Sequence, residues 1–370
     1  MPASAPLWLN QPSRFASFSR THARMILALV PVLLLLCLLA LLLPEPAVSS
    51  AASGSDQALT DLTLYERIVA GVKGGENYYR AAAAALRAGD YPLRPFLTFR
   101  MPGLAVMLAA LPDWLPRYLL LVLAFVTGLA WAVRLAPSIP RLAPRIAAII
   151  LLLGSLLAFL QSGLIAFHEI WAALFVALSL ALRKPGRWIE AVALGLIAML
   201  IRETALLYAL IMAFFAWREG ARREAIGWGV AIALFGVMLG VHAYAVAGVT
   251  GPLDPASAGW AGLQGFGLFV KSMTLATSLQ LLPLWGGALV VGLALFGWTS
   301  WDDPVATRMV AILAGYALAI SIFARLDTYY WGLMVAPVFL VGLVFVPDGL
   351  RDLFRQALDR RRITVTRVAR

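Results

Sequence analysis

The feature that most constrains this chain is the repetition of apolar runs that are as long as a membrane is thick. One run, "MILALVPVLLLLCLLALLLP", has the roughly 20 residues that an α-helix needs to cross about 30 Å of hydrocarbon. Of the 370 residues, 62% are hydrophobic. Soluble domains average only roughly 45–50% apolar residues. The sequence therefore predicts an all-α, polytopic membrane protein.

Polar breaks between the apolar runs define about ten predicted transmembrane helices. These spans lie near residues 25–43, 117–135, 145–162, 168–182, 187–201, 204–217, 226–246, 279–299, 305–324 and 329–347. A transmembrane domain is thus expected over 25–347, between a segment 1–24 and a basic tail 348–370. The first run also resembles a cleavable signal peptide, but its core exceeds the usual length of roughly 7–15 residues, which favours a retained anchor.

Arginine and lysine cluster before the first predicted span, in alternate loops and in the tail "RDLFRQALDRRRITVTRVAR". Because such residues mark cytoplasmic loops, both termini are predicted to be cytoplasmic. This orientation requires that residues 262–278 do not cross the membrane, so an external interfacial or re-entrant segment is expected there. Residues 101–112 are too short to cross and receive the same interpretation. The net charge of +11 reflects this orientation, and its dispersal among short loops argues against nucleic-acid binding.

The same orientation gathers polar residues at one external face. The long first external loop, 44–116, is expected to contain juxtamembrane helices, one of them "NYYRAAAAALRAG" with Gly89 as its end. Glu76 precedes this helix, where free amides and the helix dipole favour a charged carboxylate. The other polar residues of interest on this face are Tyr78, Tyr79, Arg100, His168, Glu169, Arg202, Glu203, Lys271, Arg325, Asp327, Tyr329 and Tyr330.

The helices around Arg202 are short for transmembrane helices. About 31 residues, from Arg187 to Trp217, serve two crossings, so each helix covers about 22 Å. Arg202 and Glu203 are therefore predicted to lie below the outer surface, in a depression. Charges at such a depth usually face a wet cavity, although these two could also simply neutralise each other at a turn.

The order of elements in the first external loop resembles that of the polytopic GT-C glycosyltransferases. An early acidic residue is followed by aromatic residues, an alanine-rich helix, "GDY" and "FRMP", and the resemblance covers roughly residues 60–220. It implies that Glu76 is the catalytic carboxylate, with Glu66 in reserve, although the acidic residue at this position in the family is usually the shorter Asp. It also implies that Glu169 occupies a second acidic position and that Arg202, in "IRETALLY", approaches a lipid phosphate.

Members of this superfamily include protein mannosyltransferases, aminoarabinose transferases and bacterial oligosaccharyltransferases. The resemblance implies transfer of a sugar from a polyprenyl-phosphate carrier to a lipid or glycan acceptor, with inversion, at the outer face of a bacterial inner membrane. A carboxylate would take the proton of the acceptor hydroxyl, and guanidinium groups would stabilise the leaving phosphate. The expected substrate-binding residues are Tyr78, Tyr79, Arg100, His168, Arg202, Glu203, Lys271, Arg325, Asp327 and Tyr329.

Several alternatives stay open from the sequence. A divalent cation, Mg²⁺ or Mn²⁺, could be held by Glu76 and Glu169, although two carboxylates far apart in the sequence do not establish such a site. His168 could be a hydrogen-bonded helix-end residue, and "DTYY" could belong to an aromatic belt. A lipid-linked glycan flippase or secondary transporter would also carry intramembrane charges, but transporters commonly contain repeats and this chain shows none. A noncatalytic subunit of an envelope assembly is the third alternative.

Overall fold

A computed structural model describes residues 5–44, 57–257, 259 and 262–359, with the side chains at 57–60, 162 and 327 outside the description. The described residues form helices and no strand, which confirms the all-α prediction for them. The α-helices are α1 (Arg20–Cys37), α2 (Gln57–Lys73), α3 (Tyr78–Ala88), α4 (Pro102–Ala110), α5 (Leu115–Leu135), α6 (Leu142–Leu156), α7 (His168–Leu182), α8 (Ile189–Ile201), α9 (Leu206–Arg218), α10 (Arg222–Ala247), α11 (Phe266–Leu275), α12 (Leu284–Ser300), α13 (Pro304–Phe323) and α14 (Val346–Leu358). The more tightly wound 3₁₀ segments are η1 (Arg14–Ser17), η2 (Leu38–Leu42), η4 (Phe96–Thr98), η5 (Leu157–Leu160), η6 (Ser162–Leu164), η7 (Glu203–Ala205), η8 (Ser278–Leu281) and η9 (Leu326–Phe345).

Several of these helices are suited to a bilayer, and the chain is a multi-pass membrane protein. Six stretches are long and apolar enough to cross one: Arg20–Leu42, Leu115–Leu135, Leu142–Leu160, Arg222–Ala247, Pro304–Phe323 and Thr328–Leu358. The other four predicted spans are also helical but shorter, with 15 residues in α7, 13 in each of α8 and α9, and 17 in α12. A helix of 13 residues rises only about 20 Å, so the expectation of short helices on either side of Arg202 is confirmed.

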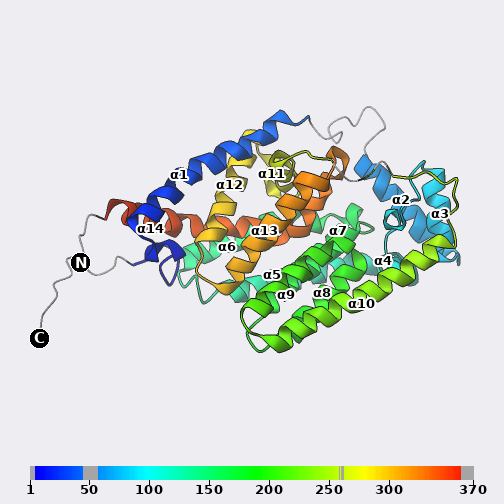
Figure 1. Ribbon diagram of the computed structural model, residues 1–370, viewed down its shortest axis with the longest axis horizontal. Helices are drawn as coiled ribbons and strands as arrows, with labels where there is room; N and C mark the ends of the chain where they lie inside the picture. The colour runs from blue at the N-terminus through cyan, green and yellow to red at the C-terminus, as the bar shows by residue number, and fades with distance from the viewer. Residues whose placement is uncertain (1–4, 45–56, 258, 260–261, 360–370) are drawn as a thin grey trace, which may run out of the picture.

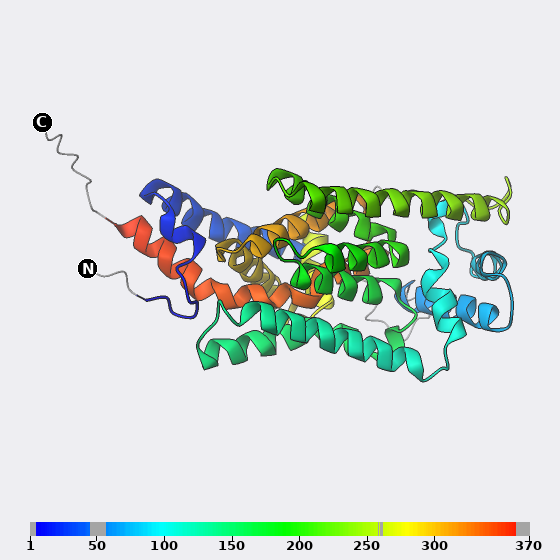
Figure 2. The same cartoon turned by 90° about the horizontal axis from the view of Figure 1, so that it is seen from below.

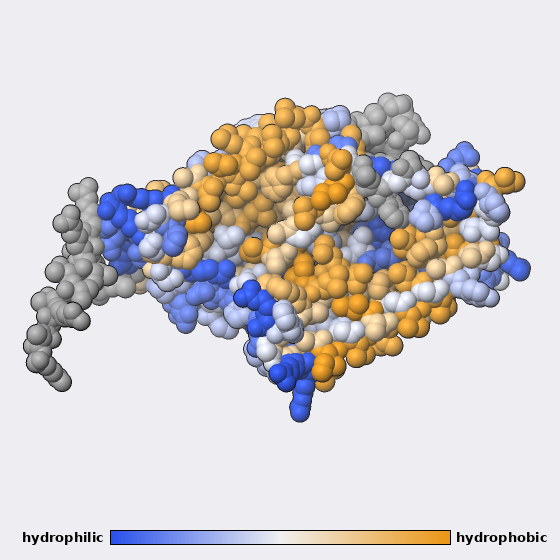
Figure 3. Space-filling view, viewed as in Figure 1, coloured by the Kyte–Doolittle hydropathy of each residue, from blue (hydrophilic) through white to orange (hydrophobic). Residues whose placement is uncertain are grey.

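The helices run back and forth between two ends of an elongated molecule (Figure 1, Figure 2). The start of α1 and the end of α14 lie at one end, and α2, α3 and α4 lie at the other. On the face drawn in Figure 3, apolar side chains cover the middle, and hydrophilic ones gather toward the two ends. This distribution fits a belt of lipid around the middle of the molecule.

Helix α7 is the centre of the bundle, because it packs against α5, α8 and η9 and is buried along nearly its whole length. The Trp131 indole of α5 donates a hydrogen bond to the Ala177 carbonyl at 2.9 Å. Elsewhere in the core, α12 and η9 approach closely at two glycines. A Cβ atom on Gly297 would lie 1.8 Å from the Gly342 carbonyl oxygen. Small residues at such a contact allow two helix backbones to pack directly together.

The predicted segment 262–278 contains α11, which is too short to cross a bilayer, as expected. It is not an interfacial helix with one open face, however. Residues 267–274 are all buried, because α11 is enclosed by η2, α12, α13 and η9. The other short segment, 101–112, contains α4, which packs against α2 and α3.

The chain ends are more structured than the predicted boundaries at 24 and 348 imply. Helix α14 occupies the start of the expected tail, and Asp348 in its first turn is fully buried. Its carboxylate accepts hydrogen bonds from the backbone amides of Leu7, Trp8 and Leu9, at 2.6, 2.8 and 2.8 Å. The segment before α1 is therefore part of the folded structure, packed against the end of the chain.

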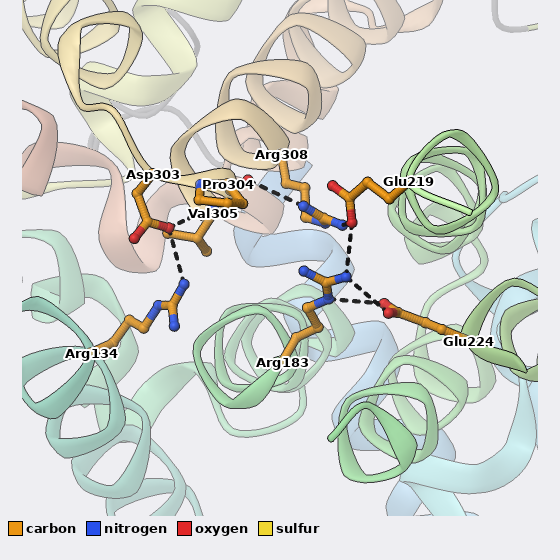
Figure 4. Close-up of polar contacts among 8 residues, drawn as sticks. All are labelled: Arg134, Arg183, Glu219, Glu224, Asp303, Pro304, Val305 and Arg308. Carbon is orange, nitrogen blue, oxygen red and sulfur yellow. Dashed lines mark hydrogen bonds and ion pairs between the residues drawn. The ribbon is translucent and has the colours of Figure 1, made fainter. Parts of the chain in front are cut away.

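A buried ion cluster joins four helices on the side opposite α2 and α3 (Figure 4). The Arg183 guanidinium donates two hydrogen bonds to Glu224, each of 2.9 Å, and one to Glu219 at 3.0 Å. Arg308 of α13 reaches the same Glu219 carboxylate at 2.5 Å. Two positive and two negative charges thus balance where α7, the α9–α10 turn and α13 meet, as burial of charge requires.

Candidate functional site

A cavity of about 520 Å³ lies at the end of the molecule that carries α2 and α3. Its walls come from α2, α3, residues 90–100, the turn between α8 and α9, residues 255–257 and the first turns of η9. This volume lies within the range of roughly 300–1,000 Å³ that is typical of small-molecule sites. Segments far apart in the sequence therefore build one cavity.

Asp61 of α2 is the buried carboxylate of this cavity. It is 6% exposed, and its two oxygens accept hydrogen bonds from two tyrosine hydroxyls. Tyr91 donates to Oδ1 at 2.8 Å, and Tyr330 of η9 donates to Oδ2 at 2.9 Å. These bonds fix the orientation of the carboxylate.

Arg100 supplies a positive charge to the cavity. Its Nε donates to the Tyr65 hydroxyl at 3.1 Å, and its backbone carbonyl accepts a bond from the Tyr78 hydroxyl at 2.6 Å. No carboxylate pairs with this guanidinium among the described side chains. Burial raises the pKa of the Tyr78 hydroxyl, so this phenol stays protonated and can hold the Arg100 backbone in place. An anion entering the cavity would meet a guanidinium that has no carboxylate at ion-pair distance among the described side chains.

Arg202 enters the cavity from the turn between α8 and α9, where the predicted hairpin is present. It is 2% exposed, with Nε 2.7 Å from Glu169 Oε1 and a second nitrogen 3.2 Å from Glu203 Oε2. Its guanidinium also stands over the Trp331 ring, 5.9 Å from the ring centroid. The suggestion that Arg202 and Glu203 simply neutralise each other is incomplete, because Glu169 shares the same guanidinium and Arg202 lines the cavity.

His168 and Glu169 lie just behind the cavity wall, at the start of α7. The His168 ring packs edge-on against Tyr65, with 4.8 Å between ring centroids, and neither ring nitrogen has a hydrogen-bond partner among the described residues. His168 was expected to be a hydrogen-bonded residue at a helix end. It does begin the helix, but the expected hydrogen bond is absent among the described residues. Neither side chain lines the large cavity.

The structure does not bring Glu76 to the cavity. The N-cap of α3 is Asn77, whose side chain accepts a hydrogen bond from the Tyr79 amide, so the position expected for Glu76 is already filled. Glu76 is exposed, and its carboxylate turns back toward Gly71 at the end of α2. It is Glu169 that pairs with Arg202, so a shared cation between Glu76 and Glu169 has no support in this arrangement.

Two other expected site residues serve different contacts. The Tyr79 hydroxyl lies 3.2 Å from Nδ1 of His242 in α10. Lys271 of α11 donates to the backbone carbonyls of Leu43 and Pro44, at 3.2 and 2.6 Å, and thus holds the end of the first span. Neither residue lines the cavity. Both were predicted because they are polar residues in an apolar context. Residues that make purely structural hydrogen bonds show the same sequence pattern.

The segment "ARLDTYY" contributes to the cavity through residues that partly differ from those expected. Arg325 lines it, as expected, and so do Thr328, Tyr330 and Trp331. Tyr329 does not line it. The side chain of Asp327 lies outside the described part of the structure.

Residues 249–257 include the cavity-lining residues 255–257 and are fixed to the end of α3. Arg87 donates two hydrogen bonds to the Asp254 carboxylate, at 3.0 and 2.7 Å. The Leu93 amide donates to the Pro255 carbonyl at 2.9 Å, and the Ser257 amide to the Arg94 carbonyl at 2.7 Å. The Arg87 contact holds the pKa of Asp254 at about 2, so its carboxylate is ionised near neutral pH.

Sequence reasoning missed Asp61, Tyr91 and Trp331 as lining residues. A signal for Asp61 was present, because Asp61, Leu64, Tyr65 and Ile68 follow helical spacing and share one face of α2. That face is now seen to line the cavity. Within the described residues no group of three His, Cys, Asp or Glu side chains is placed to hold a metal ion.

Comparison with known proteins adds no assignment. No family model, curated protein or solved structure matches the chain.

Proposed function

We propose that the chain is a membrane glycosyltransferase of GT-C type, which moves a sugar from a polyprenyl-phosphate carrier to a lipid or glycan acceptor with inversion. The observation that carries the proposal is the meeting of one buried carboxylate, Asp61, with the guanidinium groups of Arg100 and Arg202 in a single cavity. A base and cations around a space of this size are what transfer of a sugar away from a phosphate requires.

The proposed arrangement in the membrane is ten crossings in a bacterial inner membrane, with both termini cytoplasmic and the cavity at the periplasmic face. Six long apolar helices support this directly, and the four shorter helices α7, α8, α9 and α12 complete the count. Arginines gather at the opposite end, in the α9–α10 turn and in α14. Positively charged loops favour the cytoplasmic side.

Asp61 is the proposed general base, in place of the exposed Glu76. In the proposed step the Asp61 carboxylate takes the proton of the acceptor hydroxyl, and the oxygen of that hydroxyl attacks the anomeric carbon of the donor. The bond from this carbon to the phosphate oxygen breaks, and the phosphate leaves with the electron pair. The hydrogen bonds from Tyr91 and Tyr330 fix the carboxylate orientation in advance, which favours a single direction of attack.

Arg100 is the proposed main contact of the leaving phosphate. Arg202 already shares its charge with Glu169 and Glu203, whereas Arg100 has only a tyrosine hydroxyl on its guanidinium. A guanidinium without a carboxylate partner is stabilised most by a bound phosphate, because the attraction between the two charges offsets the cost of burying each of them. Arg325 lines the same cavity and adds positive charge beside it.

The test compares Asp61→Asn with Glu76→Gln in membranes supplied with labelled polyprenyl-phosphate sugar and an extract of envelope acceptors. Loss of the base is expected to lower transfer by about 10²- to 10⁴-fold. The Asp61→Asn protein should still bind the carrier. Glu76→Gln is the matched control, because its carboxylate is exposed and outside the cavity, and its transfer should be unchanged.

Loss of transfer in Glu76→Gln, with full transfer in Asp61→Asn, would identify Glu76 as the general base. Full transfer by both variants would remove the enzymatic proposal, because no other described carboxylate of the cavity is held as Asp61 is.

A further inference from the structure

Three side chains at the cavity have buried polar atoms without a hydrogen-bond partner among the described residues. They are Oε1 of Glu203, the hydroxyl of Thr204 and the indole nitrogen of Trp331, and all three residues line the cavity. Leaving such an atom unpaired costs roughly 1–3 kcal/mol, and native structures contain few of them. Three in one place indicate that a bound molecule supplies the missing partners.

The types of these atoms narrow the chemistry of that molecule. The Glu203 oxygen only accepts a hydrogen bond, the Trp331 nitrogen only donates one, and the Thr204 hydroxyl does both. A phosphate oxygen could serve the indole but would repel the carboxylate. A hydroxyl group both donates and accepts, so a ring that carries several hydroxyls matches the whole set. The flat face of Trp331 adds an apolar surface for the ring carbons.

The charges around this set also select among sugars. Arg202 is matched by two carboxylates, with Glu169 at 2.7 Å and Glu203 at 3.2 Å, so the group carries more negative than positive charge. An acidic sugar would bring a further carboxylate next to Glu203, and like charges at close range are unfavourable. A neutral or amino sugar meets no such repulsion. Arg100, without a carboxylate partner, leaves the phosphate a separate place.

Neighbouring groups hold the three residues in position. The Thr204 carbonyl accepts a hydrogen bond from the Tyr316 hydroxyl of α13 at 2.8 Å. Trp331 lies under the Arg202 guanidinium, 5.9 Å away, and Glu203 is tied to the same group. Side chains fixed in this way lose little further entropy when a ligand binds, which favours selective recognition.

We infer that Glu203, Thr204 and Trp331 form the subsite that binds the sugar ring of the donor, and that this subsite selects sugars without an acidic group. The inference rests on the proposed function, because it takes the ligand to be a prenyl-linked sugar. It adds the class of sugar and assigns two residues, Thr204 and Trp331, to its recognition.

The experiment measures binding to the purified full chain in nanodiscs by calorimetry. The probes are farnesyl phosphate alone and its conjugates with a panel of neutral hexoses and pentoses, the matching amino sugars and the matching uronic acids. The best neutral or amino conjugate should bind at least about tenfold more tightly than farnesyl phosphate. Each uronic acid conjugate should bind about tenfold more weakly than its neutral counterpart.

Three variants separate the contacts. Thr204→Val keeps the shape of the side chain and removes one hydroxyl, and Trp331→Phe removes the indole N–H together with part of the aromatic surface. Each should weaken the best conjugate by about 3- to 10-fold. Neither should change the affinity for farnesyl phosphate. Glu203→Gln removes the negative charge and should narrow the gap between neutral and uronic acid conjugates by about tenfold.

Two variants of the same chemical type outside the cavity serve as controls. The Thr250 hydroxyl donates to the Val246 carbonyl at 3.0 Å, and the Trp285 side chain is 58% exposed. Thr250→Val and Trp285→Phe should leave every affinity unchanged.

The possible failures are distinguishable. If farnesyl phosphate binds but the sugar adds no affinity, or if the variants weaken it and the conjugates by the same factor, the subsite is overturned while the proposed function stands. Tightest binding of a uronic acid conjugate by the unaltered protein overturns the selectivity. If neither farnesyl phosphate nor any conjugate binds, the proposed function fails and the subsite fails with it.

Discussion

The buried ion cluster predicts a large, specific loss of stability when Glu224 becomes Gln. Arg183 makes two of its hydrogen bonds to Glu224, and the two side chains are only 7% and 2% exposed. Removing one partner of a buried pair costs about 3–5 kcal/mol, because the other charge stays buried without compensation. Glu219 still contacts Arg183, so the lower end, about 3 kcal/mol, is expected. This corresponds to roughly a hundredfold change in the unfolding equilibrium.

The assay is reversible unfolding by SDS titration in mixed micelles, followed by circular dichroism. Glu190→Gln is the matched control, since Glu190 is 58% exposed and lies 3.6 Å from Arg187, a contact worth roughly 0–1 kcal/mol. Replacing Arg183 and Glu224 together by Met and Leu should cost less than the sum of the single changes, because no unpaired charge remains. Equal effects of Glu224→Gln and Glu190→Gln would refute the reasoning.

Two further predictions concern helix packing and the loop over the cavity. Gly297→Ala should destabilise the protein by about 1–3 kcal/mol in the same titration, because its Cβ would lie 1.8 Å from the facing carbonyl oxygen. Gly236→Ala in α10, where nothing lies within 4 Å, should be neutral or stabilising by up to about 1 kcal/mol, and equal losses would contradict the packing argument. The Asp254 pKa is lowered from 3.8 to about 2, so its contact with Arg87 stabilises the loop above pH 3.8 and is lost as the pH falls through about 2. Amide exchange of residues 249–257, corrected for the intrinsic rate, should show this loss, and an unchanged profile in Arg87→Gln would show that the pair does not hold the loop.

The helices could be predicted from the sequence because membrane helices depend on local properties. Apolar runs and polar breaks placed six long apolar helices and four shorter ones close to their observed positions, and Gly89 ends α3 as expected. The charge pattern also predicted that the segment around α11 does not cross, and α11 has only 10 residues. Such features depend on neighbours along the chain, which the sequence displays directly.

The cavity could be predicted only in part, because its members meet through tertiary packing. Arg100, Arg202, Glu203 and Arg325 were found, since charges in an apolar context are conspicuous. Asp61 was missed because its environment is set by Tyr330, which lies 269 positions away in the sequence. Glu76 was preferred for its position before α3, but local sequence could not show that its side chain turns away from the cavity.

The carboxylate of Asp348 has a consequence for the order in which the molecule is completed. Leu7 is made among the first residues and waits for a partner 341 positions later. During synthesis its amide has no access to that carboxylate until nearly every helix has been inserted. The contact between α14 and residues 7–9 can therefore form only late in synthesis, so this end of the bundle is completed last.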